Sequence, residues 1–380
     1  MAQTIILISV LLALYPYFIY PVIIGVVYLL VSLKTKTITK VNNIKPGVSI
    51  VLSVYNEEKV IKDKIENTFA LDYPYDKLEL VIGSDASFDS TNEIIHSFND
   101  TRLKFFESSQ RRGKLGVLKE IVDKARGDII VITDANTILD KKALEYIIPN
   151  FEDKKVGGVC GRLILLRTKS QSNRYMQFYW SYENMLKSME SNVCSIVAVN
   201  GQIFAIRKEL FQIKEEHLAT EDQVLGLKLV ERDFKLIFER KALAFEEVGD
   251  IWTEFKRRVR ISSGNFQSFT ILKELLFFRK GFRSFCFWSH KVLRNLTPVF
   301  LIIIFCSNLF LLKSSIYKDL FIAQVFIYCS TIFCFIFKDL YRFSGPFKFI
   351  LSFTIMQAAV MVGFLEYLSK REISIWEKQR

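Results

Sequence analysis

Cysteine and histidine are scarce in this sequence of 380 residues, which contains six cysteines and three histidines. The cysteines show no paired short spacing of the kind found in zinc ligand sets, and the histidines are scattered. We therefore predict reduced thiols and no transition-metal cluster. These residues are Cys160, Cys194, Cys286, Cys306, Cys329 and Cys334, with His96, His217 and His290.

Glycine-rich phosphate loops are also lacking. No predicted strand is followed by the spaced glycine triplet of dinucleotide-binding proteins or by a Walker sequence. This absence argues against a dehydrogenase and against a P-loop ATPase. The formal net charge is +12, but we predict no nucleic-acid partner, because the chain also contains long apolar runs.

Half of the residues are hydrophobic, and the longest apolar run lies near the N-terminus. Residues 4–33 are almost all apolar or aromatic, and this run is long enough to cross a bilayer. A cleaved signal peptide is the alternative, but the run is too long and no basic region precedes it. Basic residues after the run predict that the following domain is cytosolic. They are Lys34, Lys36, Lys40 and Lys45.

Three further apolar runs, at 296–312, 320–337 and 349–365, predict C-terminal spans. Three spans after a cytosolic domain would place the C-terminal tail outside the cell. The basic residues of that tail favour the inside, so the topology stays open and one run could be re-entrant. These residues are Lys370, Arg371, Lys378 and Arg380.

The sequence thus predicts a multi-pass protein of the cell membrane with four parts. They are an N-terminal transmembrane helix at 1–33, a cytosolic domain at 34–250, basic and amphipathic interfacial helices at 251–295, and C-terminal transmembrane helices with a tail at 296–380. Within the third part, residues 266–288 mix aromatic and basic side chains, which predicts a position in the membrane interface.

The cytosolic part alternates short β-branched runs with helical patterns. This alternation predicts an α/β fold with a mainly parallel sheet and helices on both faces. The predicted strands are 48–54, 78–84, 103–106 and 128–133, and the predicted helices are 57–69, 91–98, 114–125 and 141–151.

Acidic side chains follow two of these strands, where open sheets of this type bind ligands. Asp85 could accept hydrogen bonds from a base or ribose, or it could belong to the cap of the helix near Thr91. Asp134 follows the most apolar strand, where a carboxylate needs a partner. Mg²⁺ or Mn²⁺ bound together with substrate phosphates would supply one, while a cap of the next helix is the alternative.

Three later features carry candidate chemistry. Lys114 opens a helix after two arginines and could meet phosphates, or it could belong to a solvated basic turn. Asp222 could accept the proton of an attacking hydroxyl. Thr220 and Gln223 could instead form a capping box in the same segment. The basic run at 255–267 could meet a diphosphate on one helical face and anionic lipids on the other.

Read in order, these elements resemble the membrane-embedded branch of the family 2 glycosyltransferases with a GT-A fold. That branch includes hyaluronan, cellulose and poly-N-acetylglucosamine synthases and ceramide glucosyltransferase. The resemblance covers about residues 48–267. The motifs that carry it are Val54-Tyr55-Asn56-Glu57-Glu58, Asp85, Gly113-Lys114, Gly127-Asp128, Asp134-Ala135-Asn136, Asn200-Gly201, Thr220-Glu221-Asp222 and the arginine cluster.

The resemblance implies a role for each matching residue. It implies that the nucleotide-sugar donor contacts Tyr55, Glu57, Asp85, Lys114, Asp134 and Arg260. It further implies that Asp134 and Asn136 bind Mg²⁺ or Mn²⁺, that Asn200 and Gly201 contact the acceptor, and that Asp222, together with Glu221, is catalytic, with Asp222 as the general base. The implied reaction inverts the anomeric centre.

Two departures from the family pattern refine this expectation. Asn136 stands where the second aspartate of Asp-x-Asp usually lies, and it brings no charge to a metal. Ile261 stands where processive synthases carry a tryptophan that positions an acceptor sugar. We therefore expect transfer of one sugar from a UDP-sugar to a lipid-linked or glycan acceptor at the membrane, in cell-surface polysaccharide synthesis. The alternatives are a processive synthase and a catalytically lapsed nucleotide-sugar-binding subunit.

Overall fold

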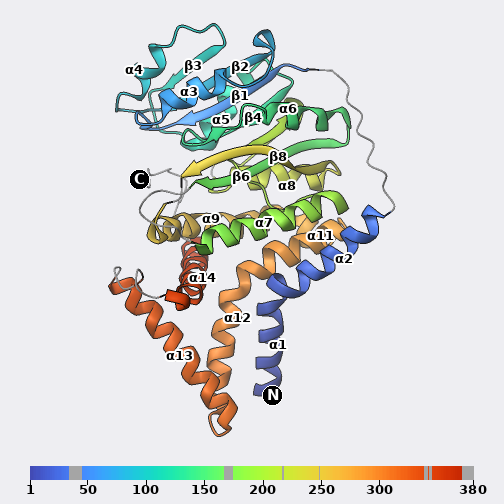
Figure 1. Ribbon diagram of the computed structural model, residues 1–380, viewed down its shortest axis with the longest axis vertical. Coiled ribbons are helices and arrows are strands. Elements are labelled where there is room, and N and C mark those ends of the chain that lie inside the picture. Colours follow the sequence, from blue (N-terminus) through green and yellow to red (C-terminus); the bar gives the residue numbers. More distant parts are fainter. Residues whose placement is uncertain are drawn as a thin grey trace.

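The computed structural model describes residues 1–33, 45–166, 174–215, 218–247, 249–337, 341 and 345–369. It contains an α/β domain above long apolar helices (Figure 1). Some residues used in the sequence argument lie outside the described residues. They are Lys34, Lys36, Lys40, His217, Lys370, Arg371, Lys378 and Arg380.

The α/β domain is built on one eight-stranded sheet in the order β3-β2-β1-β4-β7-β6-β8-β5. Its strands are β1 Val48–Val54, β2 Leu78–Asp85, β3 Leu103–Ser108, β4 Ile129–Ile132, β5 Ile138–Leu139, β6 Val156–Leu166, β7 Phe204–Arg207 and β8 Lys235–Glu247. The four strands predicted from the sequence therefore exist close to their predicted bounds. Continuous β-branched runs form these strands because both of their faces are buried.

The sheet is parallel where the sequence alternates strand and helix, and mixed beyond that region. β1 pairs in parallel with β2 and β4, which brings the carboxyl ends of these strands to one edge. β7 is antiparallel to both β4 and β6, and β5 is antiparallel to β8. Strand direction in the second half depends on pairing across long sequence separations, which the local pattern does not reveal.

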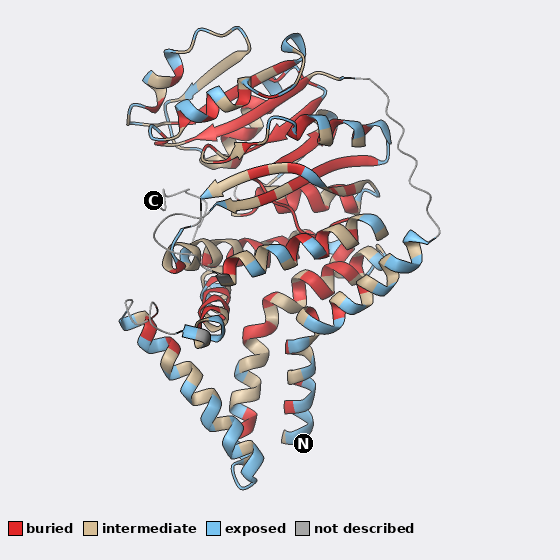
Figure 2. Ribbon diagram, in the orientation of Figure 1, coloured by how far each residue is buried: buried red, intermediate tan, exposed pale blue. Residues whose placement is uncertain are grey.

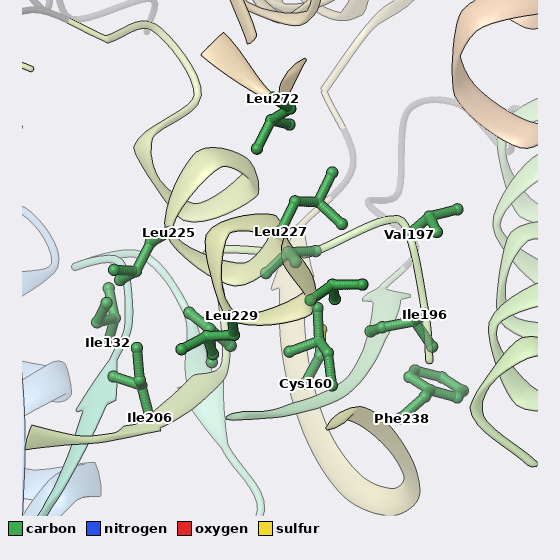
Figure 3. Packing of buried hydrophobic residues seen from close by; sticks show 14 of the residues in the cluster. Ile132, Cys160, Ile196, Val197, Ile206, Leu225, Leu227, Leu229, Phe238 and Leu272 are labelled. Atoms are coloured by element: carbon green, nitrogen blue, oxygen red, sulfur yellow. The ribbon is translucent and has the colours of Figure 1, made fainter. Parts of the chain in front are cut away.

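Helices cover both faces of the sheet, as predicted. One hydrophobic cluster joins the sheet to α3 Ile61–Phe69, α4 Thr91–His96 and α6 Ala143–Ile147. The other joins it to α5 Gly113–Lys124 and α8 Glu221–Glu231. Figure 2 shows the central strands buried. Figure 3 shows Leu225 and Leu229 of α8 beside Ile132 and Ile206 of the sheet.

Two longer helices, α7 Arg174–Val193 and α9 Ile251–Ile271, lie below α8, between the α/β domain and the helices that extend away from it (Figure 1). α9 begins at a true cap, because the carboxylate of Asp250 accepts a hydrogen bond from the backbone N–H of Thr253 at 2.7 Å. The remaining helices are α1 Ala2–Leu14, α2 Tyr20–Ser32, α10 Lys273–Leu276, α11 Phe282–Phe287, α12 Leu293–Asn308, α13 Ser315–Ile336 and α14 Lys348–Leu368.

Among the described residues, four helices are long and apolar enough to cross a membrane. They are Ala2–Ser32, Phe282–Leu311, Ser315–Ile336 and Lys348–Leu368. Each apolar run predicted to span thus forms a helix. The predicted interfacial segment at 266–288 is divided between the end of α9, the short α10 and the start of the helix at Phe282–Leu311.

A buried polar cluster joins the N-terminal helix to the rest of the molecule. The hydroxyl of Tyr20 on α2 donates to the carboxylate of Glu190 on α7 at 2.6 Å. His290 lies between Glu190, at 2.7 Å, and Glu183, at 3.2 Å. Arg294 of α12 donates to Glu183 at 2.8 Å. The cluster therefore connects both apolar ends of the chain through α7.

Candidate active site

The end of β2 and the start of α5 are joined by Asp85. Its buried carboxylate accepts hydrogen bonds from the backbone N–H groups of Arg112, at 2.6 Å, and Gly113, at 3.1 Å. It also accepts one from Nε of Arg111, at 2.9 Å. Asp85 thus stabilises the N-terminus of α5. Asp85 does not cap α4: the N-cap residue of α4 is Ser90, and the backbone N–H of Thr91 donates to the carboxylate of Asp89.

Tyr55 and Glu57 lie in the loop after β1, close to the Asp85 region. The Arg111 guanidinium stacks over the Tyr55 ring at 3.4 Å, and exposed Phe88 meets the same ring edge-on. The backbone N–H of Glu57 donates to the hydroxyl of Thr91 at 2.7 Å, which holds this loop against α4. Because this segment forms a turn, α3 begins at Ile61 and not at the predicted residue 57.

Lys114, the second residue of α5, joins two of the predicted motifs. Its ammonium group lies 2.8 Å from a carboxylate oxygen of Asp134 and 2.8 Å from one of Glu221. Burial disfavours the charged form, but these two carboxylates outweigh it and raise the pKa of Lys114. Burial likewise opposes ionisation of Asp134, yet Lys114 brings the pKa of that carboxyl below its usual value.

The loop that carries Asp134 and Asn136 is supported from below by Lys64, which the sequence argument did not single out. The fully buried ammonium donates to the hydroxyl of Thr133 at 2.9 Å and to the carbonyl of Thr137 at 2.6 Å. These two residues flank Asp134 and Asn136 in the chain. A signal was available, because Lys64 lies beside Ile61 and Ile65 on the apolar face of a helix.

Asp222, the predicted base, is located at the start of α8 beside Glu221. Burial is the main cause of a raised pKa of Asp222, and the charge of the neighbouring Glu221 is the second cause. Together they raise this pKa to about 6. A Cβ atom at Gly201 would lie 3.1 Å from a carboxylate oxygen of Asp222, so the glycine leaves room beside it. The predicted capping box is absent here, because the Gln223 side chain binds the backbone of Val197 and Val199 instead.

One pocket brings most of the predicted residues together. It lies between α5, α7, α8, α9 and the segment before β7. The predicted residues that line it are Lys114, Asp134, Asn200, Gly201, Glu221, Asp222 and Arg260. The predicted residues that do not line it are Tyr55, Glu57, Asp85 and Asn136. The first group is therefore a common site, while the second forms or supports its margin.

Two arginines of α9 present unpaired donors to this pocket. Arg258 and Arg260 both line it, and the buried Nε–H group of each has no hydrogen-bond partner among the described residues. Such donors suit an anionic ligand, because an unpaired buried N–H group is costly. The sequence left open that the basic run at 255–267 meets a diphosphate on one helical face and anionic lipids on the other. The structure places both in the same pocket, where Arg258 also contacts Tyr179 and Glu254.

Further pocket residues come from α7, which the sequence pattern did not predict. Trp180 and Glu183 line the pocket. Lys187, fully buried on the same helix, donates to the side-chain oxygen of Asn200 at 2.6 Å and so orients the Asn-Gly motif. The aromatic, amphipathic sequence of 174–193 is the signal that could have revealed this helix.

The two predicted metal ligands, Asp134 and Asn136, lie in the loop after β4. Mg²⁺ sites with substrate phosphates commonly use one or two protein oxygens. Asp134 supplies a carboxylate, and Asn136 an amide whose nitrogen is anchored by Glu246 at 3.0 Å. A second oxygen of Glu246 is buried without a hydrogen-bond partner among the described residues. No group of three His, Cys, Asp or Glu residues in the described part of the chain forms a metal site by itself.

Part of this chain is similar to known proteins. Residues 49–213 match the sequence model of Glycosyl transferase family 2. Poly-beta-1,6-N-acetyl-D-glucosamine synthase of Staphylococcus epidermidis is 30% identical over 229 residues, which are 57% of this chain and 54% of that protein. The synthase of the same name from Staphylococcus aureus (strain COL) is 29% identical with the same coverage. The alignment thus spans about half the length of these relatives.

A solved structure shows the same fold over nearly the whole chain. The mannosyltransferase from Pyrobaculum calidifontis, in complex with GDP-Man and Mn²⁺, is 20% identical and superimposes with a TM-score of 0.75. The match covers 98% of this chain and 100% of that structure. The predicted fold class is therefore confirmed, including the helices at both ends. Residues 49–213 are therefore similar to glycosyl transferase family 2, and nearly the whole chain has the fold of the solved mannosyltransferase, the GT-A fold.

Proposed function

We propose that this protein is an inverting glycosyltransferase that moves a sugar from a UDP-sugar to a lipid-linked or glycan acceptor at the cytosolic face of the cell membrane. One observation carries the proposal. The carboxyl of Asp222, with its pKa raised to about 6, lines a pocket together with Lys114 and Asp134. Such a carboxylate is ionised at neutral pH and is a stronger base than an ordinary aspartate.

The donor diphosphate binds where the pocket offers cationic groups. Lys114 opens α5, so its ammonium group and the helix N-terminus both favour phosphate oxygens. Arg260 contributes a guanidinium whose buried Nε–H lacks a partner among the described residues. Mg²⁺ or Mn²⁺, held by Asp134 with Asn136, would neutralise charge on the leaving diphosphate. The loop of Tyr55, with Glu57 and Asp85 near it, is the proposed contact for the nucleoside.

The reaction is a direct displacement. Asp222 accepts the proton of an acceptor hydroxyl while the oxygen of that hydroxyl forms a bond to the anomeric carbon. The bond between this carbon and the diphosphate oxygen breaks, and its electron pair leaves with the nucleoside diphosphate. Attack from the opposite side inverts the anomeric centre through an oxocarbenium-like transition state. Asn200 and Gly201 are the proposed acceptor contacts, because Gly201 borders the Asp222 carboxylate.

The relatives suggest a role in cell-surface polysaccharide synthesis and make UDP-N-acetylglucosamine the first donor to test. Their names also favour the second candidate, a processive synthase. Against it, Ile261 lines the pocket of this chain and offers no aromatic face to an acceptor sugar. Mass spectrometry of the products separates the candidates, because single transfer gives one added sugar and processive synthesis gives a ladder.

The Asp222→Asn variant tests the proposal. We expect UDP release to fall by about 10²- to 10⁴-fold, because a general base is lost. The affinity for the UDP-sugar should stay within about threefold, because Asp222 is placed on the acceptor side. The matched control is Asp63→Asn, an exposed aspartate on α3. Calorimetric donor binding and a UDP-release assay with Mn²⁺ and a membrane lipid extract give the two readouts.

Two outcomes would contradict the proposal. Loss of donor binding in Asp222→Asn would move this residue to the donor side and remove the proposed base. Donor binding by the unaltered protein without UDP release, for every acceptor tried, would favour a catalytically lapsed nucleotide-sugar-binding subunit.

A further inference from the structure

The last apolar helix, α14, differs from the other three helices that could cross a membrane. Protein buries 44% of its most apolar stretch, against 22% for Ala2–Ser32, 28% for Phe282–Leu311 and 11% for Ser315–Ile336. The surroundings of α14 therefore need a separate explanation.

α14 packs side by side with α9 along most of its length. Near its C-terminal end, the ring of Phe364 lies 4.7 Å from that of Phe266 on α9. Near its N-terminal end, Leu351 and Ile355 belong to one hydrophobic cluster with Ile251, the first residue of α9. The two helices therefore pack side by side and run in the same direction.

The charged side chains of α9 indicate the depth of this helix relative to the membrane. Glu254, Arg257, Arg258 and Arg260 of this helix all line the pocket that contains Asp222. Charged groups of this density are excluded from the hydrocarbon core, so α9 lies outside that core. In Figure 1, α9 lies between the α/β domain and the extended α1, α12 and α13, and α14 lies directly beneath it.

We propose that α14 lies in the membrane surface as the outer support of α9 and does not cross the bilayer. The chain then crosses three times, and the segment after α14 lies on the same side as the catalytic domain. The sequence posed a conflict, because three C-terminal spans would place the basic C-terminal residues outside the cell, whereas basic residues favour the inside. Two C-terminal spans remove this conflict. The apolar face of α14 that remains uncovered meets lipid, as expected of an interfacial helix.

A close contact gives this support a role in the reaction, and this step rests on the proposed function. A Cβ atom at Gly363 of α14 would lie only 2.4 Å from the carbonyl oxygen of Val259 on α9. Val259 stands between Arg258 and Arg260 in the chain. Any side chain at position 363 must therefore change how α14 packs against the backbone of α9 at this point. Gly363 is therefore a positioning residue for the two pocket arginines.

Thiol labelling of single-cysteine variants in intact cells tests the topology without any need for turnover. The native cysteines are first replaced by serine. Lys59→Cys then marks the catalytic domain, Ser314→Cys the turn between α12 and α13, and Ser369→Cys the end of α14. We expect a membrane-impermeant maleimide to label Ser369→Cys under the same conditions as Lys59→Cys, and Ser314→Cys under the opposite ones. If Ser369→Cys is labelled like Ser314→Cys, or Ser314→Cys like Lys59→Cys, the proposal is overturned.

Gly363→Ala tests the support. We expect the donor KM to rise about tenfold, because Arg258 and Arg260 move with α9. Gly25→Ala is the matched control, because a Cβ atom at Gly25 meets its nearest neighbour, Sδ of Met189, at an ordinary 3.6 Å. Equal kinetics of the two variants would overturn the positioning role. If Gly363→Ala does not fold, the labelling result still decides the topology. If the unaltered protein lacks transferase activity, the proposed function fails while the topology proposal stands.

Discussion

Buried carboxylates have different partners at the margin of the site, around Asp85, and at its centre, around Asp134, Glu221 and Asp222. At the margin, Asp85 accepts two backbone N–H groups and one guanidinium, so its charge is matched where it stands. At the centre, Asp134 and Glu221 share one ammonium group, and Asp222 lies next to both. A matched carboxylate holds a loop in place. At the centre, carboxylates and cations lie close together, and among the described residues Arg258 and Arg260 keep donors free for a substrate.

Removal of Lys114 should have the largest effect on this comparison. Lys114→Met leaves Asp134 and Glu221 buried without their shared cation. Loss of one partner of a buried ion pair costs about 3–5 kcal/mol of folding stability. We also expect UDP release to fall by more than about 100-fold, because the donor phosphates lose a cation. Chemical denaturation and the UDP-release assay measure the two effects.

The matched control for this prediction is Lys124→Met on the same helix. Lys124 binds Glu120 at the surface, and such pairs contribute about 0–1 kcal/mol. If Lys114→Met were as stable and active as Lys124→Met, the centre would not depend on this cation.

An intermediate effect is expected at the margin. Asp85→Ala leaves two backbone N–H groups unpaired at the start of α5, which costs about 1–3 kcal/mol. The donor KM should rise about tenfold, because α5 carries Lys114. Asp89→Ala is the control, because it removes the carboxylate that accepts from the backbone of Thr91 at the start of α4, and it should cost a similar ~1–3 kcal/mol. An equal rise of KM in both variants would show that Asp85 acts only through general stability.

The smallest effect concerns pH. Asp222 must be ionised to accept a proton, so kcat/KM should rise with pH through about 6 and level off above it. Burial and the Glu221 charge both raise this pKa. Glu221→Gln removes only the second cause, so the rise should move to lower pH by about half a unit. Exposed Glu209→Gln is the control. A profile that does not move, or moves upward, would contradict the assignment of Asp222 as the base.

The sequence predicted the elements around the site better than the contacts within it. Local patterns predicted β1 to β4 and the residues at their ends, because strand and helix periods are local properties. The role of Asp85 as a partner of Arg112 could not be predicted, because it depends on how closely α5 approaches β2. The capping box considered at Thr220 does not form, because the Gln223 side chain donates to the backbone carbonyl of buried Val197 instead.

The pocket itself was the least accessible to prediction. It needs α7 and α9, and their positions are set by contacts between residues far apart in the sequence. Lys187 orients Asn200, and Lys64 holds the Asp134 loop, yet neither residue has a motif around it. The family resemblance supplied the order of the motifs. The contacts among them, such as Lys114 with Glu221, required the folded chain.

The polar cluster around Glu190 has a consequence for how the protein is made. Tyr20 is synthesised early, and its partner Glu190 and the neighbour His290 follow much later. The carboxylate of Glu190 is fully buried in the folded protein, in contact with both Tyr20 and His290. The catalytic domain therefore completes its core after both the first and the second apolar helices are inserted. Membrane insertion is thus a step in the folding of this domain. A version that lacks residues 1–33 would lack Tyr20 and leave the Glu190 side chain without this partner.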